Sequence, residues 1–98
     1  MDAQNMVTLC SAASATGATT AVEVTKGGRY NWEAWGTWNS ATATLQRSPD
    51  DGTTWYDVES AVLSANGGYR GIDLGAGNYR VNFSGTPTSV SSILTGVN

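Results

Sequence analysis

The stretch that decides the fold is residues 29–39, which read RYNWEAWGTWN. Large aromatic residues recur here at a spacing that suits a β-strand, because side chains two positions apart point to the same face of a strand. The alternation predicts a core face made by Tyr30, Trp32, Ala34 and Trp38. Trp35 falls on the opposite, outer face, beside Glu33 and Thr37.

Trp35 has three interpretations that the spacing leaves open. A β-bulge near Gly36 would turn it into the domain with the other tryptophans of this strand. On the outer face it would be a candidate interface residue, because tryptophan is a favoured anchor between proteins. An exposed indole can also stack on the C–H face of a sugar ring, with its N–H as a polar group.

The rest of the chain has the same two-residue periodicity, interrupted by glycine-rich and polar turns. Strands are expected at residues 5–11, 19–26, 29–39, 41–45, 55–59, 61–65, 69–74, 78–84 and 88–97. No segment has a helical stripe of apolar residues. Short strands between regular turns are typical of sandwiches and barrels. We therefore predict an all-β fold, a single small sandwich or jelly-roll of about eight strands. It spans residues 1–98, with a flexible N-terminal segment at 1–5.

Composition excludes several classes of function. The chain has no histidine and one cysteine, which excludes His-based triads, His or Cys-cluster metal sites and an intramolecular disulfide. A net charge of −3 argues against a dominant nucleic-acid-binding surface and leaves open only a local basic patch. No apolar run approaches the length that spans a bilayer. We expect no cofactor, no metal, and neither nucleic acid nor membrane as a partner.

The single cysteine, Cys10, is expected to be a buried small hydrophobe in a reducing compartment. The first residues are acidic and polar, and they lack the basic and apolar regions of a signal peptide. Both features indicate a protein made in the cytoplasm.

Residues 48–55 read SPDDGTTW and match the Asp-box pattern S-x-D-x-G-x-T-W. Its defined positions are Ser48, Asp50, Gly52, Thr54 and Trp55. Asp50 can accept hydrogen bonds from turn N–H groups, and Gly52 permits a positive φ. Trp55 should then pack as the chain re-enters the sheet. We interpret the motif as a structural hairpin, although Asp50 and Asp51 also offer oxygen ligands of the kind that Ca²⁺ takes.

No catalytic constellation stands out. Pairs of carboxylates of the kind used in glycoside hydrolysis can be drawn from Glu23, Glu33, Asp57, Glu59 and Asp73. The eight acids of so small a sandwich offer such pairs by chance, and the fold leaves little room for a deep pocket. The glycines at 67–68 and 75–77 suit hairpins rather than phosphate loops, which need a following helix. A non-enzymatic function is expected.

Several features of residues 35–97 form a recognisable set. They are the run GTWNSATATLQ at 36–46, the DGTTW hairpin, GAGNYR at 75–80 and a last strand rich in Thr, Ser and Val. In these features the chain resembles small structural proteins of tailed bacteriophages, which include capsid decoration (cement) proteins and parts of virion fibres. The resemblance covers about two thirds of the chain, and it carries over no functional residue.

The resemblance implies a sandwich or jelly-roll on the capsid surface of a virion, made in the host cytoplasm. The resemblance most directly implies a cement protein that stabilises the head lattice and has the major capsid protein as its partner. A homo-oligomer is also expected, because a chain with only sixteen Leu, Ile, Val and Phe residues gains stability by assembling; the resemblance favours a trimer. The alternative is a carbohydrate- or receptor-binding domain of a phage fibre. Sugar binding requires Trp35 to lie exposed in a groove, whereas a cement role requires no groove.

Overall fold

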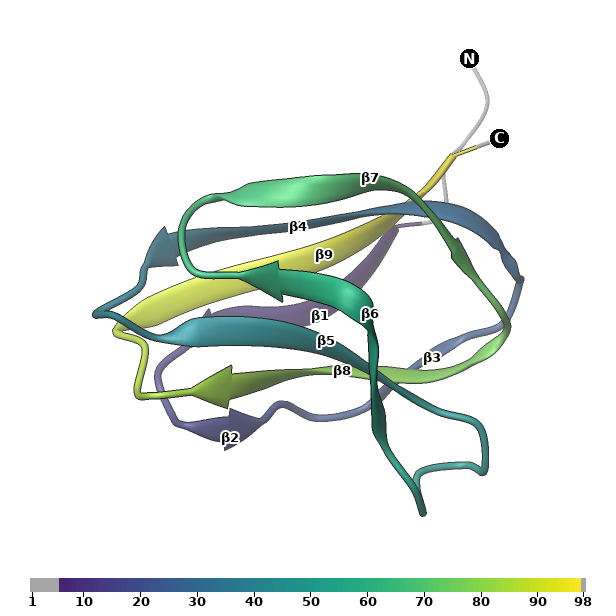
Figure 1. Ribbon diagram of the computed structural model, residues 1–98, viewed down its shortest axis with the longest axis horizontal. Helices are drawn as coiled ribbons and strands as arrows, with labels where there is room; N and C mark the ends of the chain where they lie inside the picture. Colours follow the sequence, from purple (N-terminus) through teal and green to yellow (C-terminus); the bar gives the residue numbers. More distant parts are fainter. Residues whose placement is uncertain (1–5, 98) are drawn as a thin grey trace.

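Two antiparallel β-sheets form a small sandwich (Figure 1). The computed structural model describes residues 6–97, without the side chains of residues 59, 60 and 97. The four-stranded sheet has the order β1 (Met6–Ala13), β9 (Ser89–Val97), β4 (Gly28–Thr37), β7 (Gly67–Leu74). The five-stranded sheet has the order β2 (Gly17–Ala18), β8 (Gly77–Ser84), β5 (Thr42–Ser48), β6 (Tyr56–Leu63), and β3 (Val22–Val24) also pairs with β8. The predicted all-β sandwich is confirmed; the expected flexible segment 1–5 lies outside the described residues.

Strand β4 has the two faces that its sequence predicts. Its inward side chains are buried, as is Trp38 just beyond its end, whereas Trp35 is 45% exposed. Pairing between β4 and β9 continues without a shift from Arg29 opposite Val97 to Thr37 opposite Ser89. The β4–β9 ladder therefore has no bulge at Gly36, and the interpretation in which a bulge turns Trp35 inward is wrong.

Trp32 anchors the core. It is fully buried, and its Nε1–H donates to Ser92 Oγ at 2.7 Å; Ser92 Oγ donates in turn to the carbonyl oxygen of Glu33 at 2.9 Å. Its ring stacks on that of Tyr69, with centroids 5.9 Å apart and planes 5° apart. The Tyr69 hydroxyl donates to the carbonyl oxygen of Val62 at 2.8 Å, which joins β7 of one sheet to β6 of the other.

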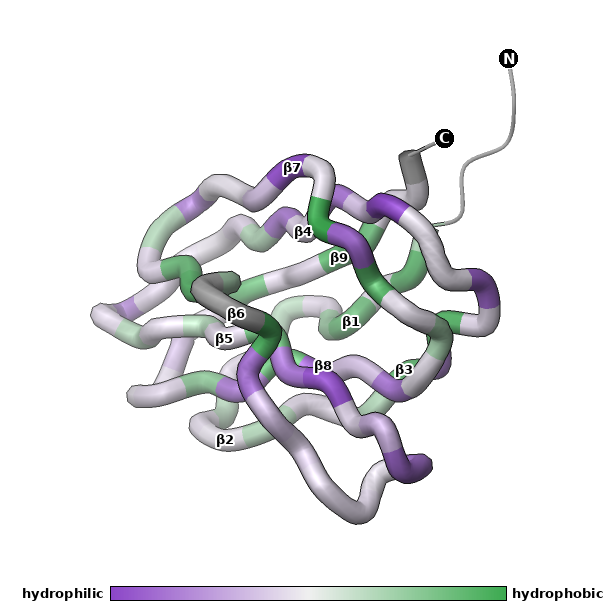
Figure 2. The backbone as a smooth tube through the Cα atoms, turned by 45° about the vertical axis from the view of Figure 1, so that its right-hand side comes forward, coloured by the Kyte–Doolittle hydropathy of each residue, from purple (hydrophilic) through white to green (hydrophobic). Residues whose placement is uncertain are grey.

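The five-stranded sheet supplies the other half of the core. The strands β5 and β8 pair in continuous register, and their inward side chains alternate with polar ones. The fully buried inward residues are Ala43, Leu45, Tyr79 and Val81. In Figure 2, hydrophobic stretches alternate with paler and hydrophilic ones along the strands, as a two-residue periodicity requires. One face of each sheet thus faces the core and the other faces outward.

Two parts of the predicted strand pattern are wrong. Residues 55–59 and 61–65 were expected as two strands, but residues 56–63 form the single strand β6. The register shifts there, since Thr44 pairs with Val62 and Gln46 with Asp57, so the extra residues of β6 bulge without breaking it. No strand is expected between residues 11 and 19, where the small polar residues and Gly17 predict a loop, but this segment contains β2, which pairs with β8. Among the described residues, no helix is long and apolar enough to cross a membrane.

Candidate functional site

Trp35 lies at the edge of a hollow of about 310 Å³ on the outer face of the β1-β9-β4-β7 sheet. We call this hollow the Trp35 hollow. Its lining comes from β4 and from the start of β7: Glu33, Ala34, Trp35, Gly67, Gly68 and Arg70. The volume is at the lower end of the range for small-molecule sites, about 300–1,000 Å³. It would hold a single small ring.

Gly67 and Gly68, the first two residues of β7, line the hollow. Gly68 pairs with Glu33 across the β4–β7 ladder. A Cβ at Gly68 would lie 2.5 Å from the carbonyl oxygen of Trp32 and 2.9 Å from Cγ of Glu33. Only glycine allows this close approach of β7 to β4. Gly68 thus lets β7 lie close against Glu33, with which it lines the hollow.

Asn66 fixes the turn after β6 against the end of β4. Its Oδ1 accepts hydrogen bonds from the backbone N–H of Gly36 and from Nε1–H of Trp38, each at 2.8 Å. The wall of the Trp35 hollow is therefore held in place before any ligand arrives. The sequence identifies Asn66 only as a turn residue, because its two donors lie about thirty positions earlier in the chain.

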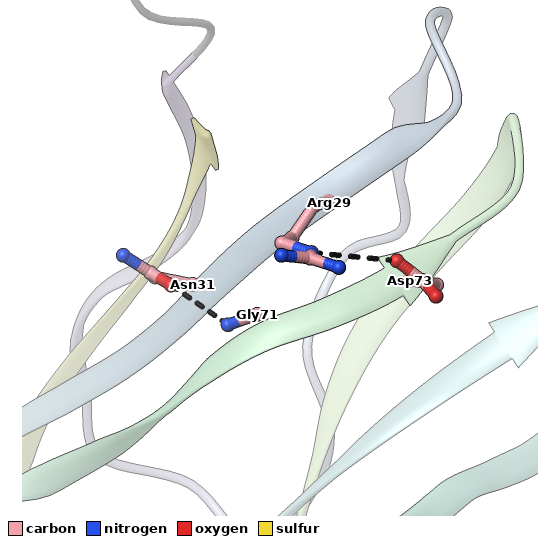
Figure 3. A network of polar contacts seen from close by, with 4 residues as sticks. All are labelled: Arg29, Asn31, Gly71 and Asp73. Atoms are coloured by element: carbon pink, nitrogen blue, oxygen red, sulfur yellow. Dashed lines mark hydrogen bonds and ion pairs between the residues drawn. The ribbon is translucent and has the colours of Figure 1, made fainter. Parts of the chain in front are cut away.

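The polar groups of the hollow are Glu33 and Arg70. Within the described part of the chain, neither side chain makes a hydrogen bond or an ion pair. The ion pair on this face joins Arg29 Nε to Asp73 Oδ1 at 3.8 Å, further along the same two strands (Figure 3). Both of its side chains are well exposed, so the pair contributes little stability. The carboxylate of Glu33 and the guanidinium of Arg70 thus line the hollow without a protein partner among the described residues.

The Asp-box residues form a closed network of hydrogen bonds in the turn between β5 and β6. Asp50 Oδ1 accepts from the N–H of Thr54 at 2.7 Å and from the hydroxyl of Ser48 at 2.9 Å. The N–H of Gly52 donates to Ser48 Oγ at 2.7 Å, and Gly52 has a φ of +93°. The N–H of Thr54 is the main cause that lowers the pKa of Asp50. The arrangement explains each defined position of the motif structurally.

Trp55 directly follows this turn. Its side chain is half-buried and lies on the outer face of the five-stranded sheet. Its Nε1–H donates to the carbonyl oxygen of Gly52 at 3.2 Å, and the guanidinium carbon of Arg80 lies 4.2 Å from the ring centroid. Arg80 Nε donates to Gln46 Oε1, and Gln46 Nε2 donates to Asp57 Oδ1. Cation–π contact and hydrogen bonds thus tie the hairpin to β5, β6 and β8.

A second hollow, of about 350 Å³, lies around Arg47, which the sequence did not single out. The guanidinium donates to the hydroxyl of Tyr79 at 3.0 Å, to the hydroxyl of Tyr56 at 3.1 Å and to the carbonyl oxygen of Ala76 at 2.9 Å. The hydrogen bond with Tyr56 is the main cause that raises the pKa of Arg47. Each of the three guanidinium nitrogens of Arg47 donates a hydrogen bond to another part of the protein. Arg47 therefore has a structural role, which is to hold the β7–β8 turn in place.

The candidate carboxylates that line a hollow are divided between the two hollows. Glu33 lines the Trp35 hollow, Asp57 and Asp73 line the hollow around Arg47, and the side chain of Glu59 lies outside the described residues. Asp51 Oδ1 accepts from Asn78 Nδ2 at 3.1 Å. Among the described residues, no three His, Cys, Asp or Glu side chains lie close enough to hold a metal ion.

Cys10 is half-buried rather than buried as expected, because β1 is irregular on both sides of it. Its Sγ–H donates to the carbonyl oxygen of Val90 at 3.5 Å. Burial raises the pKa of the thiol, which disfavours the nucleophilic thiolate.

The site with unused binding groups is therefore the Trp35 hollow. Comparisons with known proteins do not extend this assignment: no protein-family model, curated protein or solved structure matches the chain.

Proposed function

We propose that this chain is a non-enzymatic structural protein of a bacteriophage virion and that it decorates the capsid as a cement protein. The major capsid protein would be its partner on the capsid surface, and further copies of the chain would be its neighbours. The proposal rests on the resemblance of residues 35–97 and on one surface feature, the exposure of Met6 on an edge strand. A small sandwich suits this role because it presents broad faces to a lattice.

Met6 is the most exposed of the large hydrophobic residues described, with 65% of its surface accessible. It begins β1, which ends the strand order of its sheet, so no strand of residues 6–97 pairs with the outer edge of β1. A partner strand can add to such an edge by backbone hydrogen bonds, while an apolar side chain beside it is covered. The bulges of β1 lie at Thr8–Ala13, so the regular part of the edge is the part that carries Met6.

Binding to particles tests this proposal. Phage particles that lack the protein are mixed with the purified chain, and bound protein is measured by co-sedimentation. The wild-type chain should bind to saturation, and Met6→Lys should bind more weakly. Val62→Lys is the matched control, because Val62 is also an exposed hydrophobic residue, at 41%, but lies on the other sheet. Absence of wild-type binding would contradict the cement role.

Self-association belongs to the same proposal. The small aliphatic content and the free edge of β1 favour a homo-oligomer, and the resemblance favours a trimer. Sedimentation velocity at micromolar concentration measures this directly. A chain that stays monomeric both in solution and on particles would contradict the oligomer, without affecting the docking on the capsid.

The second candidate function is a carbohydrate- or receptor-binding domain of a phage fibre. The observation that favours it is the exposure of Trp35 in a hollow, since a cement role requires no such groove. As a candidate interface residue for a protein partner, Trp35 remains a prediction. The hollow beside it suits a small ring better than a flat protein surface.

A further inference from the structure

We propose that the Trp35 hollow binds a neutral pyranose ring, with Trp35 as the stacking platform and Glu33 and Arg70 as the polar partners. This inference rests on the second candidate function, and it specifies the ligand class and the residues. It is compatible with docking on a capsid through Met6.

The exposed indole of Trp35 provides an aromatic surface on which a sugar ring can stack. The side chain of Trp35 points away from the core and is 45% exposed, so it is accessible to a ligand. A flat indole matches the C–H face of a sugar ring, and binding covers apolar surface that water otherwise contacts. The hollow of about 310 Å³ that Trp35 lines leaves room for a ring beside the indole.

Glu33 and Arg70 provide the polar groups that can bind the hydroxyls of a sugar. Sugar hydroxyls both donate and accept hydrogen bonds, so a carboxylate and a guanidinium on one rim suit a pair of them. Glu33 supplies acceptors and Arg70 supplies donors, and neither is engaged elsewhere within the described part of the chain. The carboxylate of Glu33 and the net charge of −3 disfavour an acidic sugar. A neutral ring is therefore the ligand that this rim fits.

Hydrogen bonds hold the backbone beside the hollow in place. Asn66, which directly precedes Gly67 and Gly68, ties the start of β7 to Gly36 and Trp38. The backbone beside the hollow is thus fixed in advance, and ordering on binding falls mainly on the side chains of Glu33 and Arg70, which lowers the entropic cost.

The hollow is also separate from the docking edge. Met6 pairs with Thr95 of β9, and Trp35 pairs with Ser91 of the same strand. Four residues along a strand correspond to about 13 Å. In addition, Met6 lies on the edge strand β1, whereas the hollow lies between β4 and β7 at the other side of the sheet. A partner at the β1 edge leaves the Trp35 hollow open.

Saturation-transfer NMR and tryptophan fluorescence test the inference with defined probes. The probes are the methyl glycosides of glucose, galactose and mannose, with N-acetylneuraminic acid as the acidic probe. The wild-type chain should show contact between indole protons and at least one neutral probe, and weaker or no contact with the acidic one. Trp35→Ala should weaken binding by roughly tenfold or more. Trp35→Tyr should keep part of it, and Arg70→Ala should reduce it.

Met6→Lys is the matched control, and it should bind the neutral probe as the wild-type chain does. No binding of any neutral probe, or equal binding by wild-type and Trp35→Ala, would overturn the inference. So would a preference for the acidic probe. If Trp35→Ala instead loses binding to phage particles, the hollow is a protein interface. If glycoside binding fails while Met6-dependent particle binding persists, only the carbohydrate proposal falls.

Discussion

The side-chain oxygen of Asn66 lies 2.8 Å from the indole nitrogen of Trp38 and accepts its hydrogen bond. The same oxygen accepts from the backbone N–H of Gly36, also at 2.8 Å. One side chain thus joins the turn after β6 to the end of β4, on which Trp35 stands. The stability of the sandwich and the shape of the Trp35 hollow depend on the same contact.

Replacing Asn66 with Ala should therefore affect both properties. Two donors lose their acceptor, so the free energy of unfolding should fall by about 1–2 kcal/mol. Affinity for a neutral glycoside should also fall, although Asn66 does not line the hollow. Denaturant melts and fluorescence titration measure the two effects. Asn82→Ala is the control, because Asn82 makes no side-chain hydrogen bond within the described residues. Equal melting midpoints for Asn66→Ala and Asn82→Ala would refute the role of Asn66.

Replacing Ser92 with Ala should destabilise the core. Trp32 Nε1–H is buried and has Ser92 Oγ as its partner, so the substitution leaves a buried donor without an acceptor. Such a group costs about 1–3 kcal/mol. Urea melts followed by tryptophan fluorescence should show this loss, whereas the exposed Ser84→Ala should melt like the wild-type chain. A wild-type midpoint for Ser92→Ala would mean that Trp32 does not depend on this bond.

Replacing Gly52 with Val should destabilise the Asp-box turn through backbone strain alone. Its φ is +93°, and a Cβ there would meet no atom within 4 Å, so no steric contact contributes. A β-branched residue in that conformation costs about 1–3 kcal/mol. Thermal melts measure the loss, with the adjacent exposed Thr53→Ala as a control. If Gly52→Val and Thr53→Ala melt together, the turn does not hold the conformation described.

Replacing Asp50 with Asn should give a pH-dependent difference in stability. The N–H of Thr54 favours the ionised carboxylate and lowers the pKa of Asp50 in the folded chain. A lowered pKa means that the stabilisation is fully present above the unfolded value, about 3.9, and is lost as the pH falls through the folded value. Melts of wild-type and Asp50→Asn should thus differ most near neutral pH and converge in strong acid. A constant difference across this range would contradict a role for the charge.

Much of the fold could be predicted from the sequence because it depends on local periodicity. The inward set of β4 follows from alternation, and so does the outward position of Trp35. The Asp-box contacts follow from a short motif in which donors and acceptors are at most four residues apart. In these places the interaction partners are encoded side by side in the chain.

The parts that were missed depend on distant partners. β2 exists because Gly17 and Ala18 meet Phe83 and Asn82, and nothing local marks them as a strand. β6 stays whole across its bulge because β5 pairs with both of its ends. Asn66 and Arg47 act on groups about thirty residues away, so their roles follow only from the folded arrangement.

Electron cryomicroscopy of phage particles tests the central claim most directly. Particles from a phage that encodes the chain are compared with particles from which its gene is deleted. The cement proposal predicts a difference density the size of this sandwich at regular positions on the head, adjoining the major capsid protein. Identical head density in the two kinds of particle, together with absence of the chain from purified wild-type particles by mass spectrometry, would contradict it.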